Sequence, residues 1–192
     1  ADDDNGTSSG SAYIFEQQGG NWVETAKLIP SDGASNDYFG DSVAISGTTA
    51  LVGAFGNDDN GTSSGSAYIF ERQQDGTWLE AAKLTASDGE ASDSFGKSVA
   101  ISGTNAFVGN YGDDDNGTSS GSAYIFEQQQ EGNWLETAKL ISSDGRFIKQ
   151  IWCPIIGEKV HLLSIVTRKA MSSEEYVDIR LVLLNHSQEP AL

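Results

Sequence analysis

Short apolar runs, separated by clusters of Gly, Asp, Asn and Ser, fill the first three quarters of this 192-residue chain. Within residues 39–94 these runs predict four strands, at 42–46, 50–55, 65–72 and 77–85. No stretch shows the 3.6-residue apolar period of an amphipathic helix. The pattern therefore predicts an all-β fold built from short strands.

Two of these strands are apolar on both faces. Residues 67–70 read Ala-Tyr-Ile-Phe, and residues 51–55 read Leu-Val-Gly-Ala-Phe. An antiparallel sheet with one face in water would instead alternate apolar and polar residues. Four-stranded antiparallel sheets that are covered on both sides and stacked one behind another are the blades of a β-propeller. A two-sheet sandwich and a β-solenoid are the alternatives.

An internal repeat supports the propeller. Residues 113–126 recur unchanged at 2–15 and, with Asn57 for the first Asp, at 57–70. A period of this length indicates a propeller, a solenoid or an array.

The repeat divides residues 1–145 into a partial unit (1–38), a full unit (39–94) and a near-full unit (95–145). These units predict about two and a half four-stranded blades, and a closed propeller needs about four or more. We therefore expect a propeller fragment that self-associates through its open blade faces.

The order Phe39-Gly40, Ser-Val-Ala-Ile-Ser, Leu-Val-Gly-Ala-Phe and Gly-Ser-Ala-Tyr-Ile-Phe resembles the FG-GAP repeat. That repeat builds the β-propeller of integrin α-subunit heads and of related extracellular proteins. The resemblance covers residues 1–145 and implies an extracellular or cell-surface location. Its signature positions here are Phe39, Gly40, Gly53, Ala54, Phe95 and Gly96.

The chain departs from the integrin pattern at one site. In integrins a calcium loop of the type D-x-D-x-D-G lies between the FG and GAP segments. Here that position holds only Gly47-Thr48-Thr49 and Gly103-Thr104-Asn105. The integrin calcium site therefore does not carry over.

A different acidic loop is the candidate metal site. Asp113, Asp115 and Asn116 offer oxygen atoms to Ca²⁺, and Gly117 permits a sharp turn. No acidic residue follows at the far end of the loop to supply bidentate coordination. The alternative is a solvated loop, so calcium is a candidate cofactor and none is certain.

The same loops carry Asn-Gly-Thr sequons at Asn5, Asn60 and Asn116. They predict N-glycosylation in a eukaryotic secretory host. The alternative is structural, because Asn-Gly is a favoured turn sequence.

Three tryptophans, Trp22, Trp78 and Trp134, recur with the repeat. They could form an aromatic row for sugars, but packing between neighbouring blades is the favoured interpretation. The chain contains no recognisable catalytic set: His161 and His186, its two histidines, both lie outside the repeats. We therefore predict that it is not an enzyme.

Charge and composition narrow the function. Net charge is −17, and residues 1–145 carry 5 basic and 23 acidic residues. This balance argues against nucleic acid as a partner. No apolar run is long enough to span a membrane, and the single Cys153 excludes an intrachain disulfide.

We predict a non-catalytic extracellular binding or adhesion module that contacts a protein or glycan through its loops. The alternatives are a structural spacer or surface-layer repeat without a specific ligand, and a fragment of a propeller-based enzyme.

Residues 146–192 lose the repeat and form a non-repeat tail. Reading their codons one nucleotide further on turns Trp152 into Gly, because Trp is TGG and Cys153 begins with T. Ile151 written ATT then becomes Phe, which restores Phe-Gly at its place in the repeat. We therefore predict that the tail is a reading-frame artefact, and the coding DNA decides this. Within it, 160–166 and 177–184 are candidate strands.

Overall fold

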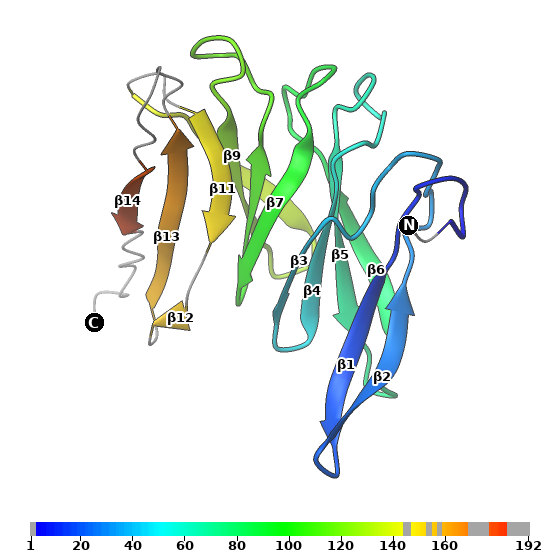
Figure 1. Ribbon diagram of the computed structural model, residues 1–192. Coiled ribbons are helices and arrows are strands. Elements are labelled where there is room, and N and C mark those ends of the chain that lie inside the picture. The colour runs from blue at the N-terminus through cyan, green and yellow to red at the C-terminus, as the bar shows by residue number, and fades with distance from the viewer. Residues whose placement is uncertain (1–2, 144–146, 153–154, 157–158, 169–176, 184–192) are drawn as a thin grey trace.

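The computed structural model describes the backbone of residues 3–143, 147–152, 155–156, 159–168 and 177–183, with side chains over residues 3–143. The described residues form strands and no helix, so none of them forms a helix that could cross a membrane (Figure 1). The repeat strands are β1 (Ala12–Gln18), β2 (Asn21–Leu28), β3 (Ser42–Ser46), β4 (Thr49–Ala54), β5 (Ser66–Arg72), β6 (Trp78–Leu84), β7 (Phe95–Ser102), β8 (Asn105–Asn110), β9 (Ser122–Gln128) and β10 (Trp134–Leu140).

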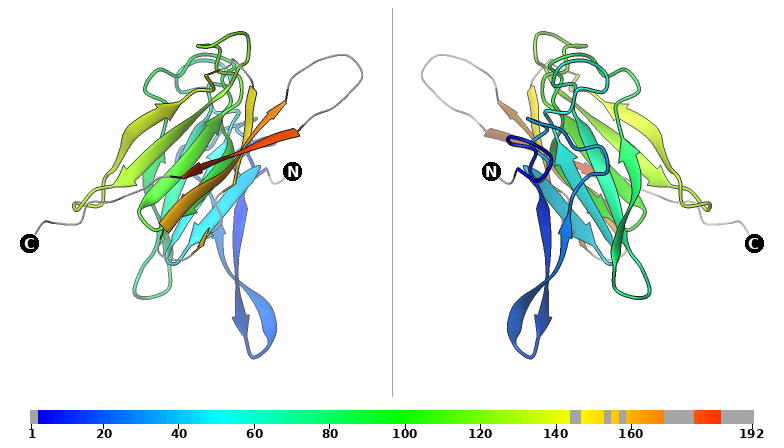
Figure 2. Two further views of the ribbon diagram at one scale, coloured as in Figure 1. Left: turned by 90° about the vertical axis from the view of Figure 1, so that its left-hand side faces the viewer. Right: turned by 90° about the vertical axis from the view of Figure 1, so that its right-hand side faces the viewer.

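Two four-stranded antiparallel sheets and one hairpin make up the repeat region. Strands β3 to β6 form one sheet in chain order, and β7 to β10 form the next. The hairpin β1–β2 stands at the N-terminal side of this stack (Figures 1 and 2). The prediction of an all-β fold with four-stranded blades is confirmed, and β3 to β6 lie within one residue of the predicted strands.

The hairpin corresponds to the outer two strands of a blade. Strand β1 pairs β2 with a bulge between Ile14 and Phe15, and β5 pairs β6 with the same bulge between Ile69 and Phe70. The repeat region is therefore half a blade followed by two whole blades.

Central strands are buried on both faces, as their composition predicts. Leu51, Val52, Tyr68 and Ile69 are all at most 1% exposed. Alternate residues feed two cores, one between the hairpin and the first sheet and one between the two sheets. Both faces of β4 and of β5 are therefore covered, and neither face is in contact with water.

The FG and GAP signature residues lie where one unit meets the next. Phe95 donates its backbone N–H to Ser64 of the preceding unit at 2.9 Å, and its ring packs edge-on against Tyr124. Gly96 adopts a φ of +84°, and a Cβ there would overlap the carbonyl oxygen of Ser66. A Cβ at Gly53 would in turn overlap the carbonyl oxygen of Gly96. Both glycines are needed because two backbones meet without room for a side chain.

The tryptophans pack between blades where a preceding unit is present. Trp78 packs against the core shared with the hairpin, and Trp134 against the core between the two sheets. Trp22, in the hairpin, is 70% exposed. The packing interpretation is therefore confirmed for the second and third tryptophans.

In the tail, the strands are β11 (Phe147–Trp152), β12 (Ile155–Ile156), β13 (Lys159–Arg168) and β14 (Val177–Leu183). Strand β13 pairs with the other three, and β11 lies against β7, β8 and β9 as β7 lies against β3, β4 and β5. The backbone of β11 thus takes the place of the first strand of a further unit. The candidate strands at 160–166 and 177–184 correspond to β13 and β14, while the reading-frame hypothesis stays a prediction.

Candidate functional site

The acidic loops that precede β1, β5 and β9 and the Ser-Asp-Gly turns at residues 31–33 and 87–89 gather at one end of the stacked sheets (Figure 1). The second and the third acidic loop close on themselves through the same backbone bond. Gly65 N–H donates to Asn57 at 2.8 Å, and the equivalent Gly121 N–H donates to Asp113 at 2.8 Å. The two loops therefore share one conformation.

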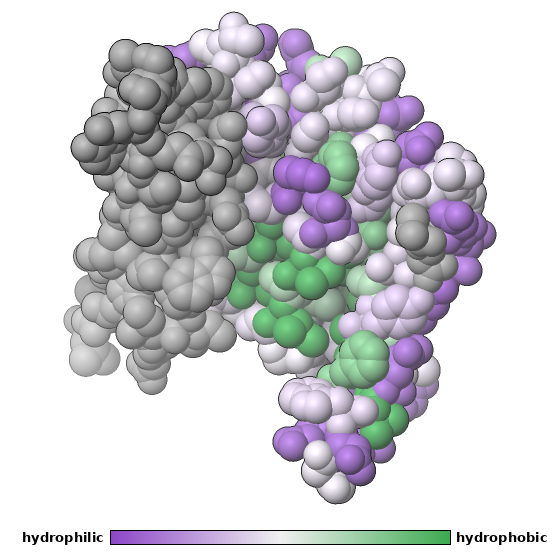
Figure 3. Space-filling view, viewed as in Figure 1, coloured by the Kyte–Doolittle hydropathy of each residue, from purple (hydrophilic) through white to green (hydrophobic). Residues whose placement is uncertain are grey.

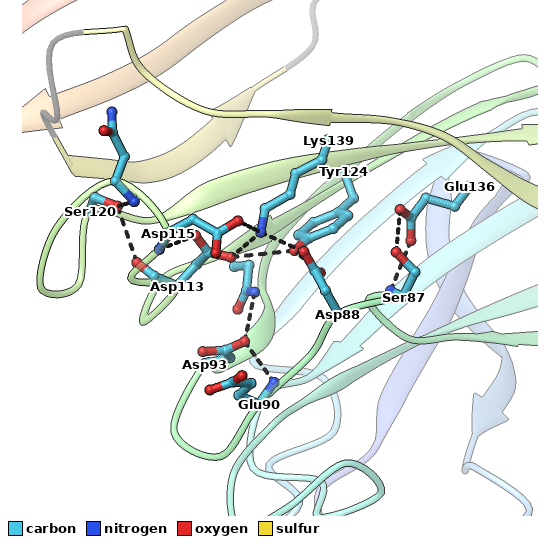
Figure 4. Close-up of polar contacts among 12 residues, drawn as sticks. Ser87, Asp88, Glu90, Asp93, Asp113, Asp115, Ser120, Tyr124, Glu136 and Lys139 are labelled. Carbon is cyan, nitrogen blue, oxygen red and sulfur yellow. Dashed lines mark hydrogen bonds and ion pairs between the residues drawn. The ribbon is translucent and has the colours of Figure 1, made fainter.

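A lysine ties the second and the third acidic loop to the preceding unit, and Figure 4 shows the contacts of the third. Lys139 Nζ lies 2.6 Å from Asp113, 2.6 Å from Asp115 and 2.8 Å from Asp88 of the preceding Ser-Asp-Gly turn. The hydroxyl of Tyr124 donates to Asp88 at 2.6 Å. At the earlier junction, Lys83 pairs with Asp32 and Asp59, and Tyr68 donates to Asp32 at 2.8 Å.

These contacts shift the pKa values of the paired groups. Burial alone would lower the pKa of Lys139, but its carboxylate partners raise it well above its ordinary value. Burial raises the pKa of Asp88, but its bonds to Lys139 and Tyr124 outweigh this, so the net pKa is lowered. Burial and the bond to Asp32 raise the pKa of Tyr68. The lysine and aspartate of each junction are therefore both charged at neutral pH.

A glutamate on the outer strand forms a second link at each junction. Glu136 accepts hydrogen bonds from the backbone N–H and the hydroxyl of Ser87, at 3.0 and 2.8 Å (Figure 4). Glu80 does the same for Ser31, at 2.7 and 2.9 Å. The turns at residues 31–33 and 87–89 are thus both held by the unit that follows them.

A buried aspartate lies beneath each junction. Asp37 is 3% exposed and accepts a bond from the Ala34 N–H at 2.8 Å, and burial raises its pKa. Asp93 accepts the equivalent bond from the Glu90 N–H at 2.9 Å. Neither aspartate was singled out from the sequence. The available signal was their 56-residue spacing, each two residues before a signature Phe.

Both buried aspartates also accept a side-chain amide, but from different positions. Asn57, at the start of the acidic loop, donates to Asp37 at 3.5 Å. Asn110, at the end of β8, donates to Asp93 at 3.2 Å. The equivalent of Asn110 in the first junction is Ala54, and the equivalent of Asn57 in the second is Asp113. Two differences between nearly identical units therefore compensate each other.

The predicted metal ligands do not converge on an open site. Asp113 and Asp115 both contact Lys139, whereas the amide of Asn116 donates to the carbonyl of Ser142. Among the described residues, no three His, Cys, Asp or Glu side chains are arranged to hold a metal ion. A calcium ion would have to displace Lys139, and calcium binding stays a prediction.

The sequon asparagines Asn5, Asn60 and Asn116 are all exposed. The glycine after each adopts a positive φ, between 115° and 123°, so the Asn-Gly pair does form a turn. The turn role is compatible with glycosylation, which stays a prediction.

One family model, described as the FG-GAP repeat, matches residues 22–70 and 78–126. Each match runs from the outermost strand of one unit to the third strand of the next, so it spans a junction. No curated protein matches the chain. The two matches together cover just over half of the residues, and the chain therefore belongs to the FG-GAP repeat family.

Proposed function

We propose that this chain is a non-catalytic, extracellular binding or adhesion module that contacts a protein or glycan through its acidic loops. The observation that carries the proposal is the repeated presentation of one loop conformation at one end of the blades (Figure 1). FG-GAP repeats typically occur in extracellular proteins, which supports the location.

The loops separate a fixed base from an exposed tip. Ser64 and Ser120 at the base are each 1% exposed and donate to the loop carbonyls at 3.3 Å. Thr62 and Thr118, near the tips, are exposed. A loop that is ordered before binding loses little conformational entropy on association, which favours recognition.

The charge of the loops favours a basic partner. Each loop carries two or three Asp side chains, and residues 1–145 have an excess of acidic residues. Such a surface attracts Lys- and Arg-rich protein surfaces and raises their association rate. A neutral glycan would instead bind by hydrogen bonds to the loop hydroxyls and amides.

A glycan array and a panel of basic extracellular proteins would test the proposal. The variant changes Thr7, Thr62 and Thr118 to Arg, which alters the tips but not the buried base. Leu79→Lys, at an exposed apolar residue of β6, is the matched control. We expect binding that the tip variant loses and the control keeps. Binding to nothing, or equal binding by both variants, would refute it.

A structural repeat is the second candidate, and the junction contacts favour it. At the two junctions that the structure describes, the Ser-Asp-Gly turns, the acidic loops and the Phe-Gly pairs all join units, so the units could serve only to build an array. A spacer would bind no ligand on the array.

A further inference from the structure

Asn57 is an amide at a place where the other two units have a carboxylate. The equivalent residues are Asp2 in the first unit and Asp113 in the third. The surface of the loop end is mostly hydrophilic or neutral in Figure 3, but the Asn57 residue is only 5% exposed. An amide carries a nitrogen that can leave when an amine attacks its carbon. The second unit therefore has a chemistry that the other two lack.

The lysine of the same unit lies beside this amide. Lys83 and Lys139 hold their Nζ atoms over equivalent tyrosine rings, each 5.3 Å from the ring centroid. In the third unit this position brings Lys139 Nζ to 2.6 Å from Asp113 Oδ2. The Oδ1 atoms of Asp113 and Asn57 both accept the backbone N–H two residues further on, so Asp113 Oδ2 corresponds to the amide nitrogen of Asn57. Lys83 Nζ is therefore within reach of the amide carbon of Asn57.

Two donors hold the carbonyl oxygen of this amide. The hydroxyl of the fully buried Ser66 donates to Asn57 Oδ1 at 2.9 Å, and the backbone N–H of Asp59 donates to it at 3.2 Å. Donors fixed around a carbonyl oxygen stabilise the negative charge that develops there when the carbon is attacked. The pair therefore forms an oxyanion hole for addition to Asn57.

A buried acid lies at the nitrogen of the same amide. Asn57 Nδ2 lies 3.5 Å from Asp37 Oδ2. Asp37 is 3% exposed, and burial raises its pKa, so it holds a proton more readily than an ordinary carboxyl. An acid at this place can carry a proton from the attacking amine to the departing nitrogen. Asp32 and Asp59 contact Lys83 Nζ and can accept the second proton.

We propose that Lys83 and Asn57 form an intramolecular isopeptide bond after the chain has folded. Lys83 Nζ bonds to Cγ of Asn57, the Cγ–Nδ2 bond breaks, and the nitrogen leaves as ammonia. The Lys83 ammonium gives up two protons: one passes through Asp37 to the leaving nitrogen, and the other passes to a carboxylate beside Nζ and then to solvent. The reaction needs no oxidant, reductant or cofactor. It fixes the acidic loop to the outer strand of its own blade.

The charge of Lys83 limits the rate. Burial alone would lower its pKa, but Asp32 and Asp59 raise it, so at neutral pH the amine is almost wholly protonated and cannot attack. The free amide and lysine described above therefore persist at neutral pH. The rate should rise about tenfold for each pH unit, in proportion to the neutral amine, until the pH reaches the pKa of Lys83.

Mass spectrometry of the folded full chain tests the proposal. Samples are kept at about pH 7 and about pH 9, then denatured and digested with trypsin. We expect a branched peptide that joins residues 57 and 83 and is lighter than its two linear parts by one ammonia, formed about a hundredfold faster at the higher pH. The branch distinguishes this product from deamidation of the Asn-Gly pairs, which joins no two peptides.

Three variants test the roles of the surrounding groups. Lys83→Arg keeps the positive charge and should form no branch. Ser66→Ala removes a carbonyl donor and Asp37→Asn removes the acid, and each should slow the branch by more than about tenfold. Tryptophan fluorescence checks that each variant is folded.

The third unit offers a matched gain of the reaction. It has Lys139, Asp93 and Ser122 at the equivalent places, but Asp113 in place of the amide. Asp113→Asn combined with Asn110→Ala should install the amide beside Asp93 and yield a second branched peptide, which joins residues 113 and 139. The unchanged third unit should form none.

Two outcomes would overturn the proposal. One is the absence of the branched peptide at both pH values in the folded chain. The other is a branch that forms at the same rate in Ser66→Ala and Asp37→Asn, because it would then not depend on the groups around the amide. Where one of these variants does not fold, the double variant in the third unit decides, and its failure to form a branch counts against the proposal.

Discussion

The compensating differences between the two junctions make a quantitative prediction. Changing Asn57 to Asp removes the amide that donates to the buried Asp37. It also places a second carboxylate beside the Asp37 carboxylate, where that amide was. Ala54→Asn should restore a donor, because Asn110 fills that role beside Asp113 in the second junction.

The magnitude follows from the burial of Asp37. Loss of a hydrogen bond to a buried charged group costs about 1–3 kcal/mol. Repulsion between the two carboxylates adds to this, but Lys83 can pair with the new carboxylate as Lys139 pairs with Asp113, which offsets much of the repulsion. We therefore expect Asn57→Asp to lower the free energy of unfolding by about 2 kcal/mol.

Ala54→Asn alone should also destabilise, because it buries an amide while Asn57 already occupies Asp37. The double variant should be more stable than either single variant, with a coupling energy on the order of 2 kcal/mol. Urea unfolding followed by tryptophan fluorescence measures all four proteins.

The second junction supplies the matched control. There Asn110→Ala removes the amide that donates to Asp93, and adding Asp113→Asn should restore part of the lost free energy of unfolding. A double variant no more stable than Asn57→Asp alone would refute the compensation.

Four further predictions concern the junctions and loops. Gly103→Ala should cost about 1–2 kcal/mol for its positive φ alone; Gly96→Ala should cost clearly more, and equal losses in urea unfolding would contradict the backbone contact. Trp78→Ala should lower stability by about 2–3 kcal/mol and Trp22→Ala by less than about 0.5 kcal/mol, since only the former packs against a neighbouring unit; similar losses would count against this packing. The free energy of unfolding should fall as the pH drops below 3.8, the unfolded-state pKa of Asp88, because the lower pKa of this carboxyl in the folded state means that its stabilisation is lost as the pH falls from 3.8 through the folded-state pKa. Asp88→Asn should flatten this pH dependence, and an unchanged slope would show that Asp88 does not contribute to it. Millimolar calcium should leave the melting temperature unchanged, because a lysine ammonium already lies between the loop carboxylates; a rise would support a metal site.

The strands were predictable from the sequence because the apolar side chains that become buried are contiguous in the chain. Runs such as residues 67–70 are apolar at every position, and a strand of this type is stable only between two covering layers. The repeat then supplied the number of sheets. The packing of Trp78 and Trp134 between neighbouring units was predictable in the same way, because both recur with the repeat.

The polar junctions were not predictable, because their partners are distant in the chain. Asp113 and Asp115 read as metal ligands beside one another, but Lys139 reaches them from a strand that returns past the loop. Asp88 joins the same group from the preceding unit. Only the pairing of strands reveals that a cation is already present.

The Phe-Gly contact described above has a consequence for folding cooperativity. Because the signature residues of one unit complete the unit before it, n units in a row share only n minus one such contacts. The mean stability of a unit therefore rises with the length of a linear array, toward a plateau at which the two deficient ends no longer matter. A ring gains the missing contact and loses both ends in a single step, so closure is worth more than the addition of any one blade.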